Sequence, residues 1–152
     1  MFLYRISKRA HIEDLTGAGA RLYGGRWNHR GVPLVYTSES RSLATVEYLV
    51  HLSLPEAPSD LSIATLEVPD DIVLEELDPS SLPKNWRDSP APVELADIGS
   101  EWARSGTSLL LRVPSAVVEH EHNILINPAH DGMSRVKLLK VEPYKLNERL
   151  MR

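Results

Sequence analysis

Short apolar stretches, broken by glycine and proline, dominate the hydrophobic pattern of the chain. Stretches of this length, several of them with alternating polarity, are typical of β-strands. We expect strands at residues 2–7, 32–37, 62–68, 72–77, 108–113, 123–127 and 136–141.

Residues 40–54 show the clearest helical spacing, because Leu43, Val46 and the apolar residues after them recur three or four positions apart. Ser38 stands where its hydroxyl can cap the start of this helix. Pro55 follows directly and would end it, since proline cannot continue a helix.

A second helix is expected at residues 92–104, with Gly106 just beyond its end. The glycine-containing residues 11–23 are expected to be loop-like or weakly helical. Strands outnumber helices and do not alternate strictly with them. The pattern therefore predicts an α+β fold with a mixed or antiparallel sheet, in a single domain over residues 1–152.

The composition narrows the class of protein. Of the 152 residues, 42% are apolar, 25% are charged and only 6% are aromatic, so we expect a globular protein with a mainly aliphatic core. The chain has no cysteine, which excludes disulfides, thiolate metal sites and a cysteine nucleophile. Charges interrupt the first ten residues, and no stretch has transmembrane length, so no membrane association and a cytoplasmic location are expected.

Charge is unevenly distributed. The formal net charge is −4, without the basic excess of a nucleic-acid binder, so no direct nucleic-acid contact is expected. Residues 53–105 hold twelve acidic and three basic side chains, whereas both ends are net positive. The acidic middle is either a solvated surface or a partner face. The positive ends are suited to an anion.

Residues 24–31 combine paired glycines with groups that bind ligands. Arg26 and Arg30 carry planar donors that fit phosphate or carboxylate. Trp27 offers an aromatic face, and Asn28 is a further candidate contact. Together they indicate an anionic ligand with an aromatic part, such as a nucleotide. The alternative is an ordinary glycine-rich turn with solvated arginines.

Glu47 falls inside the apolar stripe of the first predicted helix, between Leu43 and Ala44 on a helical wheel. A carboxylate in that position faces the core or the floor of a cleft. Burial of a charge is costly, so such a carboxylate is usually paired or functional. The alternative is a glutamate at the helix edge that reaches water or an arginine.

Three further residues are candidates by position. Tyr36 ends an apolar strand just before the predicted helix, and it could equally be the edge of the core. Ser115 follows a proline at a strand end; without a nucleophile elbow around it, we expect a hydrogen-bond donor. Asn127 follows an apolar strand as a candidate substrate contact, with plain turn chemistry as the alternative.

His120 and His122 could present two imidazoles from one strand. A metal site needs more ligands than these, and no suitable motif supplies them. We expect a solvated turn there and no metal.

Several motifs occur in the order found in one family. They are Tyr4-Arg5-Ile6-Ser7, Gly25-Arg26-Trp27-Asn28 with Gly31, Val35-Tyr36-Thr37-Ser38, Ala44-Thr45-Val46-Glu47, Val113-Pro114-Ser115 and Leu125-Ile126-Asn127-Pro128-Ala129-His130. The chain in this respect resembles the RES-domain proteins, which include the toxins of type II RES–Xre toxin–antitoxin pairs. The ordered set, rather than any single motif, carries the resemblance from residue 4 to about residue 142.

The resemblance implies an ADP-ribosyltransferase-like fold and an enzyme that consumes NAD+ as its substrate, with no cofactor. Position by position, Arg26 and Glu47 match the arginine and glutamate of the family, Tyr36 an active-site tyrosine and Ser115 the serine. Trp27, Asn28, Arg30 and Asn127 are the expected substrate contacts.

The implied function is a toxin that cleaves the nicotinamide–ribose bond by hydrolysis or phosphorolysis and arrests growth. The implied partner is an Xre-like helix-turn-helix antitoxin, and a homodimer within that complex is one arrangement it allows. Two alternatives stay open: an ADP-ribosyltransferase that modifies a protein, and a non-catalytic nucleotide-binding module.

Overall fold

A computed structural model describes residues 1–52 and 58–151. Its strands form one sheet in the order β4-β5-β6-β2-β1-β3-β7, antiparallel except for the β4–β5 pair. The strands are β1 (Phe2–Lys8), β2 (Val35–Ser38), β3 (Leu61–Glu67), β4 (Leu74–Glu76), β5 (Leu110–Pro114), β6 (His122–Ile126) and β7 (Lys137–Pro143). The predicted α+β class with a mixed sheet is confirmed.

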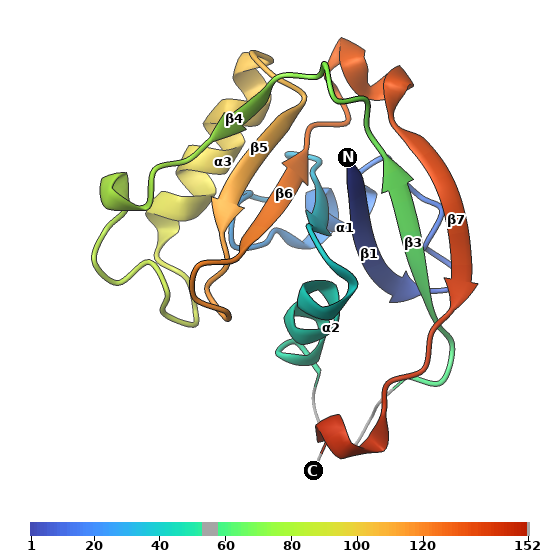
Figure 1. Cartoon of the computed structure of the whole chain (residues 1–152). Coiled ribbons are helices and arrows are strands. Elements are labelled where there is room, and N and C mark those ends of the chain that lie inside the picture. Colours follow the sequence, from blue (N-terminus) through green and yellow to red (C-terminus); the bar gives the residue numbers. More distant parts are fainter. Residues whose placement is uncertain (53–57, 152) are drawn as a thin grey trace.

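The sheet is connected weakly at its centre. β1 and β2 share a single residue pair, Tyr4 with Ser38, whereas β1 and β3 pair along seven residues. The sheet therefore has two arms, β4-β5-β6-β2 and β1-β3-β7, which spread apart in Figure 1. Helix α2 lies at the lower end between them (Figure 1) and contacts both β1 and β2.

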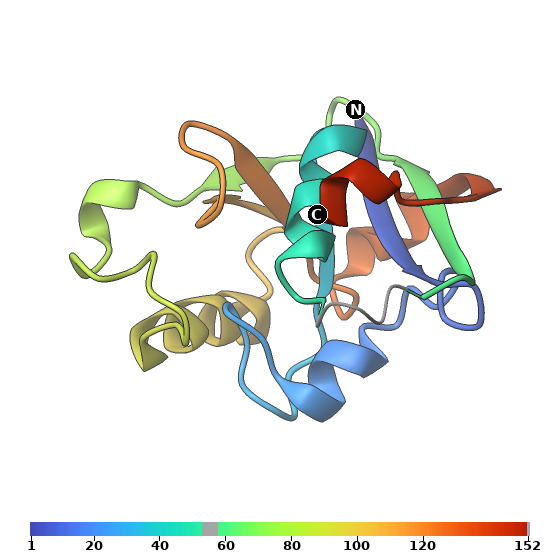
Figure 2. The ribbon, with the colours of Figure 1, turned by 90° about the horizontal axis from the view of Figure 1, so that it is seen from below.

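Helices occupy the faces and ends of the sheet. They are α1 (Ala18–Tyr23), α2 (Arg41–Leu49) and α3 (Val93–Ser105), with short 3-10 turns η1 (Pro79–Ser81), η2 (Asp131–Arg135) and η3 (Glu148–Met151). Viewed from below in Figure 2, α1 and α3 lie on one side of the molecule, and α2 lies on the other. None of the helices in residues 1–52 and 58–151 combines the length and apolar character that crossing a membrane requires.

The start of α2 differs from the prediction. Ser40, not Ser38, caps the helix, and its Oγ accepts a hydrogen bond from the backbone N–H of Leu43 at 3.0 Å. Ser38 belongs to β2 and pairs across the sheet with Asn123, so it is not free to cap. The helix ends at Leu49, short of the predicted boundary; Pro55 lies outside the described residues.

Two apolar clusters cover opposite faces of the central strands. The first lies under α3 and includes Trp27, Leu34, Leu95, Trp102, Leu111, Val113 and Leu125. The second includes Leu3, Val35, Leu66, Leu110, Ile124 and Ile126. Both are mainly aliphatic, as the composition predicts, and burial of this surface is the main source of fold stability. The apolar frame holds β2, β5 and β6 in register beneath the polar residues described next.

Candidate active site

Glu47 lies in the last part of α2, where its side chain is only partly exposed. Its Oε1 accepts two short hydrogen bonds, from Ser115 Oγ at 2.6 Å and from Asn123 Nδ2 at 2.7 Å. The carboxylate is thus paired, as the position in the apolar stripe predicts. Hydrogen bonds to an ionised acceptor are strong ones, so they fix its orientation.

Ser115 follows β5 directly and is buried. Its Oγ accepts the backbone N–H groups of Val117 and Val118 at 3.1 and 3.0 Å. Because two lone pairs are occupied in this way, the hydroxyl proton is available for Glu47. The predicted role of Ser115 as a hydrogen-bond donor is confirmed in the structure.

Asn123 is a site residue that the sequence reasoning missed. It lies on β6 opposite Ser38 of β2, and its Oδ1 accepts a hydrogen bond from Ser38 Oγ at 2.7 Å. Its amide group therefore links the sheet to Glu47. The available signal was an amide at the start of an otherwise apolar strand, Ile124-Leu125-Ile126.

Tyr36 is on the same face of β2 as Ser38, since alternate residues of a strand share a face. Its hydroxyl donates to Asn28 Oδ1 at 2.6 Å and accepts the backbone N–H of Trp27 at 3.1 Å. Burial raises the pKa of Tyr36 far above its ordinary value, so the phenol stays neutral. Gly25 permits this contact, because a Cβ there would come within 2.7 Å of the tyrosine hydroxyl.

Arg26 extends from the same loop and is held by backbone rather than by side chains. Its two terminal nitrogens donate to the carbonyl oxygens of Trp86 at 2.8 Å and Asp88 at 3.1 Å. Burial lowers the pKa of Arg26, and the negative charge of Glu47 opposes this effect most strongly. The guanidinium and the carboxylate therefore act within one electrostatic environment.

The other predicted substrate contacts lie differently. Trp27 is 3% exposed and packs in the first core cluster, and Asn28 is buried with its Nδ2 on three backbone carbonyls. Arg30 is exposed. Asn127 lies just beyond the far end of β6 from Asn123 and donates to the carbonyl of Ala103. Hydrogen bonds thus join Glu47 to Ser115 and join Tyr36 to the loop that carries Arg26, and Trp27 has no open face.

The expected histidine turn holds no ligand cluster. His120 is exposed and has a positive φ of 65°, and His122 is partly buried at the start of β6. Within the described ranges, no group of three or more histidine, aspartate or glutamate residues is placed to hold a metal.

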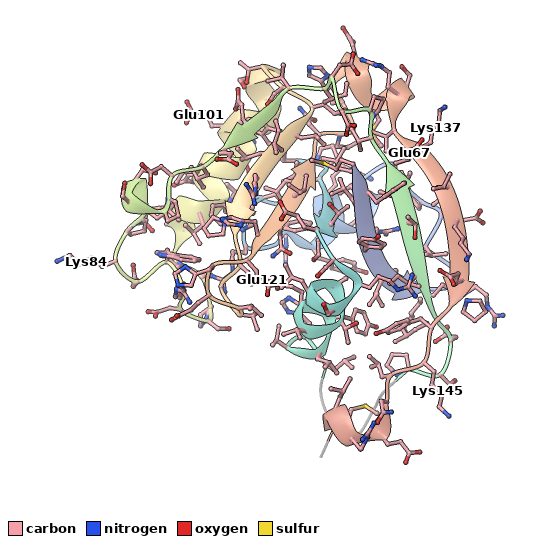
Figure 3. All side chains as sticks on the ribbon, viewed as in Figure 1. Glu67, Lys84, Glu101, Glu121, Lys137 and Lys145 are labelled. Carbon is pink, nitrogen blue, oxygen red and sulfur yellow. The ribbon has the colours of Figure 1, made fainter. Side chains whose placement is uncertain are left out.

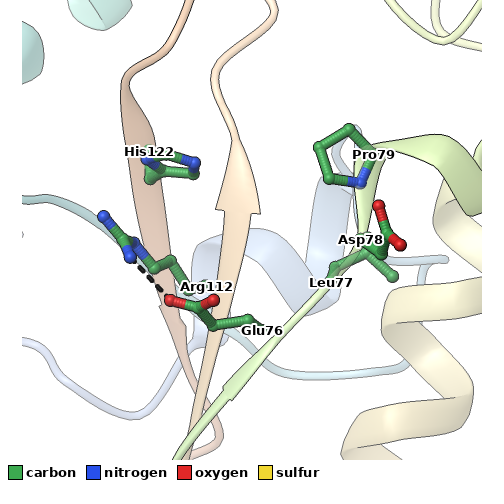
Figure 4. Close-up of a pocket in the computed structure, with 6 residues that line it drawn as sticks. All are labelled: Glu76, Leu77, Asp78, Pro79, Arg112 and His122. Carbon is green, nitrogen blue, oxygen red and sulfur yellow. Dashed lines mark hydrogen bonds and ion pairs between the residues drawn. The ribbon is translucent and has the colours of Figure 1, made fainter.

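A pocket of about 390 Å³ lies on the opposite face of the β5–β6 pair (Figure 4). Arg112 and His122 line it, and these residues alternate with Val113 and Asn123, so their side chains point away from Glu47. Arg112 is paired there with Glu76 at 2.6 Å and Glu39 at 2.7 Å. This pocket is therefore separate from the candidate active site.

Many charged side chains lie on the outer surface of the molecule, away from the candidate site. Lys84 and Glu101 project away from the body of the molecule in Figure 3, as do Lys137 and Lys145 at the other end. The partly buried Arg26 and Glu47 differ from these solvated charges. A fixed carboxylate beside a guanidinium can hold an anionic ligand and stabilise positive charge that develops next to it.

The fold is α+β, and the candidate site centres on the Glu47 carboxylate, which is hydrogen-bonded to Ser115 and Asn123. The model of the RES domain family matches residues 2–147, nearly the whole described chain. The chain therefore belongs to the RES domain family.

Two relatives within that family are named as toxins. It is 44% identical over 144 residues to "Toxin Res" of Yersinia enterocolitica, covering 94% of this chain and 93% of the relative. It is 42% identical over 142 residues to "Prs ADP-ribosylating toxin" of Sphingobium sp., covering 92% and 88%.

The fold is similar to that of a solved structure. A chain of the M. tuberculosis MbcT–MbcA toxin–antitoxin complex superposes with a TM-score of 0.72 at 19% identity, covering 95% of this chain and 84% of that one. At this identity the likeness concerns the fold.

Proposed function

We propose that this chain is a toxin enzyme that cleaves the bond between nicotinamide and ribose in NAD+. The observation that carries the proposal is the Glu47 carboxylate, which is held by Ser115 and Asn123 within the electrostatic reach of Arg26. The family resemblance assigns the same arginine and glutamate to NAD+ consumption.

Cleavage of this bond builds positive, oxocarbenium-like charge on the ribose. Glu47 would stabilise that charge and could orient a ribose hydroxyl or the attacking acceptor. Arg26 would bind the pyrophosphate with its planar fork and so fix the reacting ribose. The carbonyls of Trp86 and Asp88 hold that fork in a defined orientation.

Tyr36 and Ser115 would support these two groups. The Tyr36 hydroxyl is committed to Asn28 and Trp27, so it is the ring that would pack against the nicotinamide. Ser115 donates a hydrogen bond to Glu47 and would act mainly by orienting that carboxylate. It would also contact the ribose or the nicotinamide amide.

The acceptor defines two forms of the proposal. With water or phosphate as acceptor, the enzyme depletes NAD+ by hydrolysis or phosphorolysis. With a protein side chain as acceptor, it is an ADP-ribosyltransferase. The relative at 42% identity named "Prs ADP-ribosylating toxin" favours this second form.

Mass spectrometry of purified protein with NAD+, with and without phosphate, tests the proposal. Free ADP-ribose or its phosphate indicates depletion, and ADP-ribose attached to protein in an added cell extract indicates transfer. Unchanged NAD+ in both arms, with protein that binds NAD+, would instead identify a nucleotide-binding module and would overturn the proposed cleavage.

A toxin of this kind needs an inhibitor, and we propose an Xre-like antitoxin for this chain. The similar fold in a toxin–antitoxin complex supports a partner of this type. An acidic group of the partner would be attracted to Arg26 and the exposed Arg30. Expression of this chain alone should lower cellular NAD+ and stop growth, and co-expression of the antitoxin should restore both. Normal growth with abundant folded protein would contradict the toxin assignment.

A further inference from the structure

The hydrogen bonds around Glu47 are unequal. Ser115 and Asn123 both donate to Oε1, and no group in residues 1–52 and 58–151 donates to Oε2. One carboxylate oxygen is therefore anchored to the protein, and the other is left for a ligand. Both donors must therefore lie on the Oε1 side of the carboxylate, and Asn123 on β6 is one of them.

The amide of Asn123 is itself oriented from behind. Ser38 Oγ donates to Asn123 Oδ1 at 2.7 Å, so the amide oxygen is occupied and the Nδ2 must face Glu47. Ser38 is 4% exposed and pairs with Asn123 in the β2–β6 register. The hydrogen-bonded series from Ser38 through Asn123 to Glu47 thus begins in the paired strands β2 and β6.

Asn123 differs from Ser115 in what else it does. Ser115 also accepts two backbone N–H groups and so supports the turn that follows β5. Among the residues that the structure describes, the Asn123 side chain has two partners, Ser38 and Glu47. Its removal should therefore affect the carboxylate more selectively than the removal of Ser115.

We infer that Asn123 is a positioning residue for the reaction, which with Ser38 behind it fixes Glu47 so that Oε2 faces the reacting ribose. The inference rests on the proposed NAD+ cleavage. It assigns a role to a residue outside the family motifs quoted above. A group that positions a carboxylate for charge stabilisation should change kcat more than KM.

Steady-state kinetics of NAD+ consumption tests this role. Asn123→Ala should lower kcat about tenfold with KM within about twofold, as expected for the loss of one hydrogen bond to a charged group. Asn123→Asp should lower kcat further, because it places a second carboxylate against Glu47. Ser38→Ala should lower kcat by about threefold, and Ser38→Thr, which keeps the hydroxyl, should restore it.

Thr37→Val is the matched control. Thr37 is buried on the neighbouring rung of the same strand pair and donates to the carbonyl of Ile124, on the other face of the sheet. The Thr37→Val variant should lose about as much free energy of unfolding as Asn123→Ala, but it should keep the kcat of the parent. Equal losses of kcat in Thr37→Val and Asn123→Ala would overturn the positioning role in favour of a structural one.

Crystal structures of the parent protein and Asn123→Ala provide a readout that does not depend on turnover. The Glu47 carboxylate should keep one orientation in the parent and rotate or become heterogeneous in the variant. An unchanged carboxylate would contradict the inference even if the parent consumes NAD+. A parent that leaves NAD+ intact while Glu47 moves in the variant would instead contradict the proposed function.

Discussion

The two charged groups of the candidate site are held in opposite ways. Glu47 is anchored by two side chains: Asn123 on β6, and Ser115 in the turn directly after β5. Arg26 lies in an irregular loop and donates to the backbone carbonyls of Trp86 and Asp88, in the proline-rich segment before α3. The carboxylate on α2 is thus hydrogen-bonded to a strand and to the turn after a strand, whereas the guanidinium joins two loops.

This difference fits two separate roles, transition-state stabilisation for Glu47 and substrate binding for Arg26. A group that stabilises a transition state must be preorganised, and packed strands provide that. A group that binds a pyrophosphate can keep its two backbone partners, because a guanidinium has five N–H donors and the carbonyls use two of them. Changes on the Glu47 side should therefore appear mainly in kcat, and changes on the Arg26 side mainly in KM.

The largest effect is expected for Glu47→Gln. The amide keeps the size of the side chain but removes the negative charge, so NAD+ turnover should fall by about a thousandfold. Thermal unfolding should be nearly unchanged, because the side chain is only partly buried. Turnover at the parent rate in a folded variant would show that Glu47 does not stabilise the transition state.

Arg26→Lys should have the second largest effect. Lysine keeps the charge but cannot hold two carbonyls and a phosphate with a planar fork, so KM for NAD+ should rise by about ten- to a hundredfold. Arg41→Lys is the control, because Arg41 is exposed at the start of α2 and pairs with Glu142 at 3.1 Å. Equal changes in KM for the two variants would remove the special role of Arg26.

Tyr36→Phe tests the contact between the arginine loop and β2. The variant leaves Asn28 Oδ1 and the Trp27 N–H without their partner, which should cost about 1–3 kcal/mol of the free energy of unfolding at neutral pH.

The pH dependence of this variant follows from the sign of the pKa shift. Burial raises the pKa of Tyr36 above its ordinary value of 10.0, so above that pH the unfolded chain ionises first and the parent loses stability. Urea unfolding between pH 9 and 11, a window of about one unit on either side of that value, should show a shallower loss for Tyr36→Phe. An identical slope in both proteins would mean that Tyr36 is not buried as described.

The smallest effect is expected for Arg87→Gln. Arg87 lies over the Trp86 ring and is 3.8 Å from Glu119, and both charged side chains are exposed. Exposed pairs contribute about 0–1 kcal/mol, so KM for NAD+ should change by less than about threefold. A change as large as that of Arg26→Lys would show that this surface pair, rather than Arg26, holds the segment in place.

The sequence predicted the regular elements better than their connections. The alternation of β3 and the spacing and glycine stop of α3 are local signals, and both elements form within a few residues of their predicted limits. The cap of α2 was wrong because Ser38 and Ser40 are both suitable, and only the pairing of β2 with β6 decides between them.

Part of the candidate site could be predicted from the sequence, and part could not. Glu47 stood out because a carboxylate in an apolar stripe needs a partner, and the structure supplies two. Asn123 could not be found in this way, because its role depends on cross-strand register with Ser38. The sequence gives no sign of the partners of Arg26, because they are backbone carbonyls, which every residue has.

The central claim is that NAD+ lies between Arg26 and Glu47, and a crystal structure of Glu47→Gln with bound NAD+ tests it most directly. The variant should hold intact NAD+, with its pyrophosphate on Arg26 and the nicotinamide ribose beside the side chain at position 47, on the side away from Ser115. NAD+ bound elsewhere, for instance in the pocket beside Arg112 and His122, would contradict the account.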